Sequence, residues 1–150
     1  MPTITPFLWF DSQAEETMNY YLSIFKNSKV LSVNRADGKV LTVTFELEGQ
    51  KFMALNGGPH FKFTEAISLF VNCETQQEVD EMWEKLSQGG EKGRCGWLKD
   101  RFGLWWQIIP SALGKLMNDP NPKKSRAVFQ AMMKMNKIVI KDLERAYAGA

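Results

Sequence analysis

The first part of the chain begins with an apolar run that is followed by apolar residues at helical spacing. Residues 4–10 are mostly aromatic or aliphatic, and Asp11 and Ser12 after them are typical helix-capping residues. Apolar side chains then recur every three or four positions, as they do on the buried face of an amphipathic helix. The residues of this stripe are Met18, Tyr21, Leu22 and Phe25. The pattern therefore predicts a strand over residues 4–10, a cap at Asp11 or Ser12, and a helix.

Three stretches that favour β-strands follow this helix. They cover residues 30–34, 40–47 and 50–56. Turn-forming pairs that end in Gly38 and Gly49 separate them. Val43, Phe45 and Leu47 alternate with polar residues, so the middle strand has one buried face and one face in water. The first part of the chain is therefore predicted to be a β-α-β-β-β unit.

A second unit with the same pattern begins after the glycine-rich break at residues 56–59. Its predicted elements are a strand near residues 67–71, a helix from Glu74 or Thr75, and short strands near residues 94–99 and 104–109. A shift of 61 residues places Trp9 on Phe70 and Met18 on Val79. The chain is therefore predicted to be internally duplicated, an arrangement that usually places one site between the two copies.

Residues after Pro110 have no counterpart in the first unit and are predicted to be helical. The apolar residues of the main stripe, spaced by four, three and four positions, are Val128, Met132, Met135 and Val139. Asp142 is expected to cap a last short helix that ends before Gly149. The whole chain is thus predicted to be one α+β domain built from two tandem βαβββ modules and C-terminal helices. Its parts are module one over residues 1–58, module two over residues 64–110 and a helical extension over residues 111–150.

Composition and charge describe an ordinary globular chain of 150 residues, of which 44% are hydrophobic and 24% charged. The net charge of +2 is too small to attract nucleic acid or anionic lipid over a distance. No apolar run approaches the roughly 20 residues of a membrane-spanning helix. Basic residues gather in the tail. Reversing the charges of Lys134, Lys137 and Lys141 tests whether these residues bind nucleic acid or a membrane. We expect a solvated surface there, and neither nucleic acid nor membrane as a partner.

The cysteines and the N-terminus indicate a compartment. Cys73 and Cys95 are the only cysteines, and the first residues lack both the basic and the apolar region of a secretory signal. The expected location is therefore the cytoplasm, where both thiols would stay free.

Several motifs occur in a fixed order along the chain. They are Pro6-Phe7-Leu8-Trp9-Phe10, Leu55-Asn56-Gly57-Gly58-Pro59, Phe61-Lys62-Phe63, Glu65-Ala66-Ile67-Ser68, Cys95-Gly96-Trp97-Leu98-Lys99-Asp100 and Trp106-Gln107-Ile108-Ile109-Pro110. With the doubled unit, they resemble the vicinal-oxygen-chelate superfamily of glyoxalase I, bleomycin-resistance proteins and extradiol dioxygenases. They look most like its PhnB-like branch, which carries the label 3-demethylubiquinone-9 3-methyltransferase. The resemblance extends over essentially the whole chain, including the Met-rich tail.

This resemblance implies two facing sheets around a U-shaped cleft, usually in a homodimer, but it supplies no reaction by itself. Metal-using relatives hold a divalent ion with four inward residues, typically His, Glu or Gln. Carried over by position, these slots fall on Thr5, on Ala66 or Ser68, on Ala54 or Asn56, and on Gln107. Only Gln107 matches that ligand set, so we expect a cleft without a tightly bound metal and without a cofactor.

Gln107 is the strongest candidate for ligand contact, because an inward amide can donate and accept hydrogen bonds beside an apolar indole wall. Strand alternation predicts Trp105 and Gln107 on one face and Trp106 on the other. Asn56 either lets a ligand approach the backbone or belongs to a simple turn. The full set of cleft candidates is Trp9, Asn56, Ser68, Phe70, Trp97, Trp105 and Gln107.

The remaining reactive or soft side chains receive no catalytic assignment. His60 is either a general base or an exposed loop residue, and both readings stay open. The two cysteines are expected to be structural thiols rather than nucleophiles. A flexible apolar surface suited to a protein partner is predicted at Met132, Met133 and Met135.

Two functions from different classes remain. The first is a homodimeric binding protein whose aromatic cleft holds a small, largely apolar molecule. The second is an enzyme of the same fold, with metal-assisted lyase, isomerase or dioxygenase chemistry, or with the methyl transfer that the family label names. The glycine pairs precede predicted strands rather than helices, unlike the loops that hold nucleoside-based methyl donors, so the sequence favours the first function. The ligand and any reaction stay open.

Overall fold

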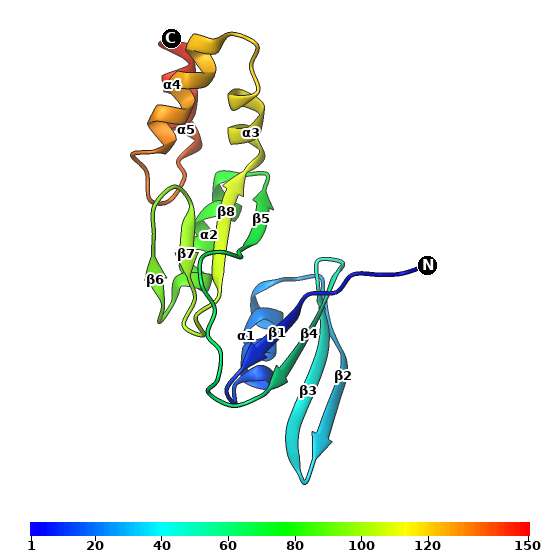
Figure 1. The fold of residues 1–150 in the computed structure, drawn as a ribbon. Helices are drawn as coiled ribbons and strands as arrows, with labels where there is room; N and C mark the ends of the chain where they lie inside the picture. Colours follow the sequence, from blue (N-terminus) through cyan, green and yellow to red (C-terminus); the bar gives the residue numbers. More distant parts are fainter. The chain divides into compact units, whose positions relative to one another are not determined.

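The computed structural model describes all 150 residues as two compact units, residues 1–62 and residues 63–150. Each unit contains one four-stranded sheet, and helices complete it (Figure 1). None of the helices is long and apolar enough to cross a lipid bilayer.

The first unit contains β1 (Phe7–Phe10), α1 (Ala14–Ile24), β2 (Ser28–Ala36), β3 (Lys39–Leu47) and β4 (Gln50–Asn56). Its strands lie in the order β1-β4-β3-β2, with β1 parallel to β4 and the other pairs antiparallel. The turn between β2 and β3 places Asp37 at φ 53° and Gly38 at φ 78°, the left-handed conformation that a tight hairpin requires. The predicted β-α-β-β-β unit is therefore confirmed, although β1 begins at Phe7 rather than at residue 4.

The second unit contains β5 (Leu69–Cys73), α2 (Gln76–Ser87), β6 (Glu91–Lys92), β7 (Trp97–Lys99) and β8 (Trp105–Pro110). Its strand order, β5-β8-β7-β6, repeats that of the first sheet, including the parallel outer pair. The internal duplication is thus confirmed. The two-residue strand β6 carries no periodic pattern, and the sequence did not predict it as a separate element.

In each unit one helix covers one face of the sheet. Tyr21 of α1 is fully buried, and its ring centroid lies 6.5 Å from that of Phe45 on β3. In the second unit Val79 and Leu86 of α2 are fully buried. The shift of 61 residues matches these two positions to Met18 and Phe25 of the first unit and therefore predicts their burial. The opposite face of each sheet, which we call the open face, carries no helix of its own βαβββ unit.

The two module helices begin differently. Thr75 caps α2, because its side-chain oxygen accepts a hydrogen bond from the Glu78 N–H at 3.1 Å. The helix was predicted to start at Glu74 or Thr75, and it begins at Gln76. The predicted cap of α1 at Asp11 or Ser12 was wrong. Gln13 occupies the capping position without a side-chain bond, and the Asn56 side chain, reaching from β4, accepts the Ala14 N–H at 2.8 Å.

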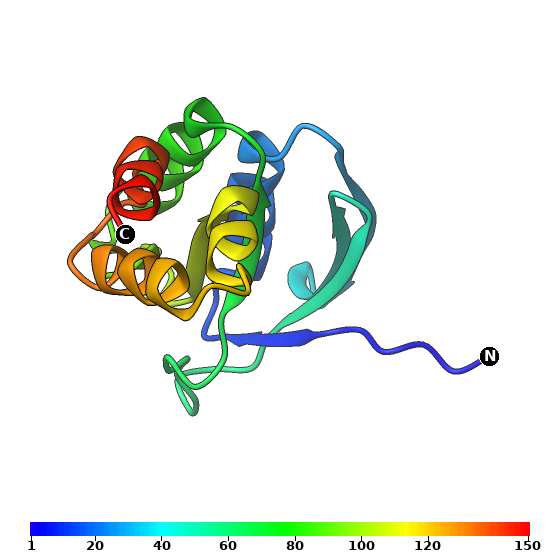
Figure 2. The ribbon, with the colours of Figure 1, turned by 90° about the horizontal axis from the view of Figure 1, so that it is seen from above.

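The C-terminal extension forms α3 (Ser111–Met117), α4 (Pro122–Met132) and α5 (Ile140–Ala148). Figure 2 shows these three helices grouped together at the end of the second sheet. They share a core that also includes Ile109 of β8; its other buried members are Leu113, Val128, Ile138 and Leu143.

Two predictions for this extension need correction. The apolar stripe through Met135 and Val139 was expected to be one helix, but α4 ends at Met132 and a non-helical segment, residues 133–139, follows. Met135 still packs against the core of the C-terminal helices, and Ile138 of this segment is fully buried in it. Asp142 lies in the first turn of α5 rather than at its cap, which is Val139.

Candidate ligand-binding face

Most of the predicted cleft residues lie together on the open face of the second sheet. The strand register pairs Phe70 on β5 with Gln107 on β8, and Gln107 with Trp97 on β7. Trp105 precedes Gln107 by two residues and therefore shares its face. We call the surface formed by Ser68, Phe70, Trp97, Trp105 and Gln107 the aromatic face.

Gln107 lies at the centre of the aromatic face and is half-buried. Its Nε2 donates a hydrogen bond to Ser68 Oγ at 3.0 Å, which fixes the orientation of the amide. A side-chain amide carries two donor hydrogens and an acceptor oxygen, so this one bond leaves capacity for a bound molecule. Gln107 can thus serve as a polar anchor within an apolar surface.

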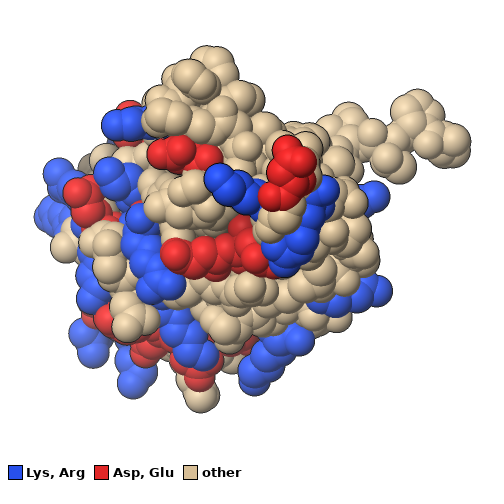
Figure 3. Space-filling model, turned by 90° about the horizontal axis from the view of Figure 1, so that it is seen from below, with Lys and Arg blue, Asp and Glu red and all other residues tan.

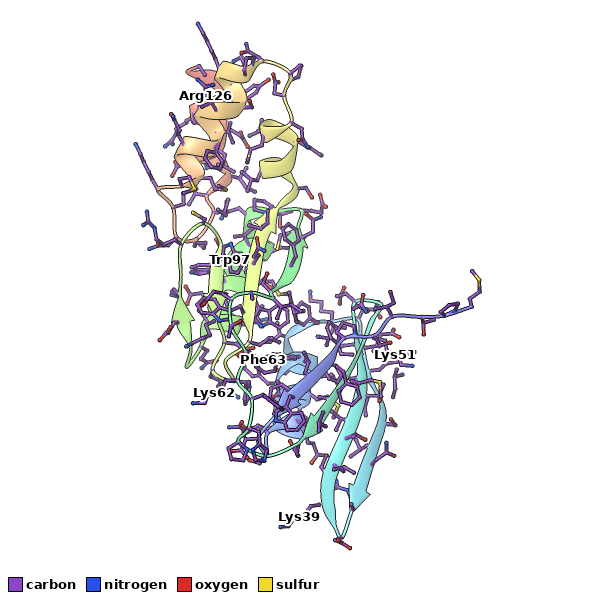
Figure 4. The ribbon with its side chains drawn as sticks, viewed as in Figure 1. Lys39, Lys51, Lys62, Phe63, Trp97 and Arg126 are labelled. Atoms are coloured by element: carbon purple, nitrogen blue, oxygen red, sulfur yellow. The ribbon has the colours of Figure 1, made fainter.

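Two tryptophans give the aromatic face its apolar area. The rings of Trp97 and Trp105 meet edge to face, with centroids 6.5 Å apart. Lys99 lies beside them, with its Nζ 5.8 Å from the Trp105 ring and 3.6 Å from a carboxylate oxygen of Glu91. Figure 4 shows Trp97 on β7 of the second unit. Such a surface suits a flat apolar molecule that stacks on indole rings.

Trp106 has a structural role on the opposite face, as strand alternation predicts. It is buried, and its indole N–H donates a hydrogen bond to Asp100 Oδ2 at 2.9 Å. The other carboxylate oxygen of Asp100 accepts the backbone N–H groups of Phe102 and Leu104. This buried carboxylate organises the turn between β7 and β8. The sequence pattern placed residues 100–103 between two predicted strands and did not reveal the role of Asp100.

Trp9 and Asn56 of the first unit do not share a face. The register pairs Trp9 with Leu55, and Phe10 with Asn56, so Trp9 lies on the open face and Asn56 on the face covered by α1. Asn56 accepts the Ala14 N–H and donates to the Val40 carbonyl oxygen at 3.1 Å. Both ends of its amide are therefore used within the fold.

Trp9 is held by the segment that follows β4. Its indole N–H donates to the Gly58 carbonyl oxygen at 2.9 Å, and its ring centroid lies 4.9 Å from that of Phe61. A side chain at Gly57 would place its Cβ 2.2 Å from the Trp9 ring, so only glycine fits at this position. His60 is an exposed residue of the same segment, with its ring centroid 6.4 Å from that of Trp9.

The positions that relatives use for a metal are distributed as follows. Thr5 precedes β1, and Ala54 is fully buried on the face covered by α1. Ser68 and Gln107 are hydrogen-bonded to each other on the aromatic face. The structure contains no group of three or more His, Cys, Asp or Glu side chains that could hold a metal ion.

The two cysteines are free and differ in surroundings. Cys73 is buried at the end of β5, and burial, together with the nearby carboxylates of Glu78 and Glu74, raises the pKa of its thiol to about 11. This thiol is therefore protonated at neutral pH and is a poor nucleophile. Cys95 has a positive φ of 57°, and its Sγ lies 3.9 Å from the Met133 Sδ.

The first unit also has an open hollow of about 660 Å³ that sequence reasoning did not predict. Its lining includes Asp11, Glu15, Arg35, Lys39, Val40 and Leu41. Charges of opposite sign meet in it, because Arg35 lies 3.4 Å from a carboxylate oxygen of Glu15. Figure 3 shows the same mixture of acidic and basic side chains across one face of the molecule.

Comparison with known proteins matches the chain to a family. The family model described as 3-demethylubiquinone-9 3-methyltransferase matches residues 2–109. No protein with a curated description matches significantly. The match ends at Ile109, so the expectation that the resemblance extends through the Met-rich tail was wrong.

Solved structures agree with this match. A PhnB protein from Bacillus cereus is 38% identical, with a TM-score of 0.69, and the alignment covers 73% of this chain and 100% of that chain. A protein from Pseudomonas aeruginosa shares the fold at 18% identity and a TM-score of 0.62, covering 73% of this chain and 98% of that chain. A glyoxylase/bleomycin resistance protein/dioxygenase domain from Frankia sp. shares it at 15% identity and a TM-score of 0.51, covering 73% and 92%. The chain therefore belongs to the PhnB-like, 3-demethylubiquinone-9 3-methyltransferase family, and it shares its fold with a glyoxylase/bleomycin resistance protein/dioxygenase domain.

Proposed function

We propose that the protein binds a small, largely apolar molecule on the aromatic face of its second sheet. The observation that carries this proposal is that Phe70, Gln107 and Trp97 are paired in one row across three neighbouring strands. A packed core would bury such side chains, yet Phe70 is 59% exposed. Exposed aromatic area beside a placed amide is the composition of a small-molecule site.

The chemistry of the aromatic face defines the class of ligand. Indole and phenyl rings favour a flat, conjugated or aromatic molecule, because stacking adds to the burial of apolar area. The amide of Gln107 favours a ligand with one hydroxyl or carbonyl group. We therefore expect a ligand with an aromatic body and a single polar group.

A thermal-stabilisation screen of metabolites identifies such a ligand, because a molecule that binds only the native state raises its apparent stability. A hit is expected to lose at least tenfold in affinity in Trp97→Ala and in Gln107→Ala. Phe129→Ala is the matched control, since Phe129 is an exposed aromatic residue of α4 outside the aromatic face. Equal binding by all three variants would place the ligand elsewhere and contradict the proposal.

Catalysis is the alternative, and the family description is the observation that favours it. The glycine pairs lie between β4 and β5 and between α2 and β6, so neither connects a strand to a helix as a dinucleotide-type loop does. Metal analysis of protein purified without an affinity tag separates the alternatives. A stoichiometric divalent ion, bound more weakly by Gln107→Ala, would favour a metal-assisted enzyme.

We also propose a homodimer in the cytoplasm. The dimer is supported by the family resemblance, and the compartment by two free thiols, which a reducing environment preserves. The predicted Met-rich partner surface is reduced to Met133, which is 45% exposed, because Met132 and Met135 pack against the core of the C-terminal helices.

A further inference from the structure

The open face of the second sheet is organised in rows that cross its strands. The register pairs Trp105 with Lys99 in the first row, and Phe70, Gln107 and Trp97 in the second. In the third row Asn72 pairs with Ile109. Cys95 lies in the turn that precedes β7, next to Gly96, whose carbonyl oxygen accepts the Ile108 N–H. Successive rows lie about 7 Å apart, the length of two strand residues.

Every position of the third row contacts the C-terminal extension. The Asn72 amide donates a hydrogen bond to Ser111 Oγ, at the first residue of α3, over 2.9 Å. Ile109 is only 8% exposed because it belongs to the core of the C-terminal helices. Cys95 donates its backbone N–H to the Met135 carbonyl oxygen at 2.8 Å, and its Sγ touches Met133. The extension therefore contacts the end of the open face that directly follows the aromatic face, and it buries Ile109 there while Asn72 stays exposed.

The non-helical segment between α4 and α5, residues 133–139, is firmly attached to the second unit. The Gly96 N–H donates to the Asn136 carbonyl oxygen at 2.7 Å, and Lys137 pairs with Asp80 of α2 at 2.9 Å. A Cβ at Gly96 would lie 2.8 Å from Ile109 and 3.1 Å from Ile138, so the backbone approach requires glycine there. Such close packing makes the segment a fixed boundary rather than a mobile cover.

We propose that the C-terminal extension is a wall that limits the length of molecule held on the aromatic face. This inference rests on the proposed function and adds a specificity determinant to it. The wall is built from residues that follow the part of the chain matched by the family model, which ends at Ile109. Met133 is 45% exposed and contacts Cys95, which lies two residues before Trp97 in the chain.

A homologous series of phenols with para n-alkyl chains from methyl to octyl measures the position of this wall. The phenol ring and hydroxyl suit the tryptophans and Gln107, and the alkyl chain reports the length available. Calorimetric titration of the full chain is expected to show a three- to fourfold gain in affinity for each added methylene. The gain should stop at a chain length set by the wall, and Trp97→Ala should weaken every member of the series.

Substitutions at Met133 move the wall in opposite directions. Met133→Ala is expected to extend the limit by one or two methylenes, and Met133→Phe to shorten it. Met117→Ala is the matched control, because Met117 of α3 packs against the same helical core. If one Met133 variant fails to fold, the other still has to shift the limit.

The outcomes separate the two proposals. An unchanged limit in a folded Met133 variant overturns the wall and leaves binding on the aromatic face intact. A limit that shifts equally in Met117→Ala shows general loosening of the helices and also overturns the wall. If no phenol of the series binds in a way that Trp97→Ala weakens, the proposed function and this inference are both overturned.

Discussion

Asn56 shows how a single side chain changes its meaning once its face of the sheet is known. In sequence it stands beside two glycines in a family motif, which suggested contact with a ligand. In the structure it lies under α1, where its amide joins the first turn of the helix to the backbone of β3. A polar residue with both ends of its amide bonded inside the fold is a stabilising residue.

Asn56→Ala is therefore expected to reduce the free energy of unfolding by about 1–2 kcal/mol, the usual effect of losing a helix cap and a partly buried hydrogen bond. Asn56→Asp keeps the acceptor for the Ala14 N–H and should lose less. Urea denaturation measures both changes. If the Asn56→Ala protein is fully stable but no longer binds ligand, Asn56 is a ligand-binding residue rather than a stabilising one.

The thiol of Cys73 should make the free energy of unfolding depend on pH in the alkaline range. Its thiol pKa is raised from 9.0 to about 11 in the folded protein, so the unfolded chain releases this proton more readily. The stabilising difference is complete below the unfolded value, and it is lost as pH rises from 9.0 to about 11.

Urea denaturation should consequently show a loss of about 1–2 kcal/mol across that interval. Cys73→Ala should show a smaller loss, because the remaining alkaline dependence then comes from other groups, such as Tyr147, whose hydrogen bond to Asp119 raises its pKa. Identical slopes for both proteins would contradict this origin.

At the scale of elements, the non-helical segment before α5 depends on one glutamine of α2. Gln76 donates a hydrogen bond to the Ile138 carbonyl oxygen at 3.0 Å and accepts the Ile140 N–H at 2.8 Å. These two bonds satisfy backbone groups at the start of α5, which has no side-chain cap of its own. The C-terminal extension is therefore joined to the module by a side chain as well as by its core.

Gln76→Ala is expected to destabilise the extension by about 1–2 kcal/mol, because it leaves two backbone groups without partners. Amide hydrogen exchange should accelerate in α5 while β1 to β4 keep their protection. Gln77→Ala is the matched control, since Gln77 is exposed and bonds only to Glu81 of its own helix. Uniform acceleration over the whole chain would instead indicate global destabilisation.

At the scale of the whole molecule, the homodimer proposed above predicts the association of two chains. Light scattering should give a mass of twice 17.2 kDa at micromolar concentration. Met133→Lys tests whether the exposed methionine takes part, because a charge in an apolar interface is costly. A mass that stays at one chain over all concentrations would contradict the homodimer.

The sequence by itself determined the order of strands and helices, apart from the two-residue strand β6, and the internal duplication, because periodicity and turn residues act over short distances along the chain. The motifs in their fixed order indicated the family. Alternation also placed Trp105 and Gln107 on one face and Trp106 on the other. It did not reveal that Asn56 caps a helix, that Asp100 organises a turn, or that residues 133–139 leave the helical path. Those features depend on contacts between residues distant in sequence, and only the tertiary structure decides which partners meet.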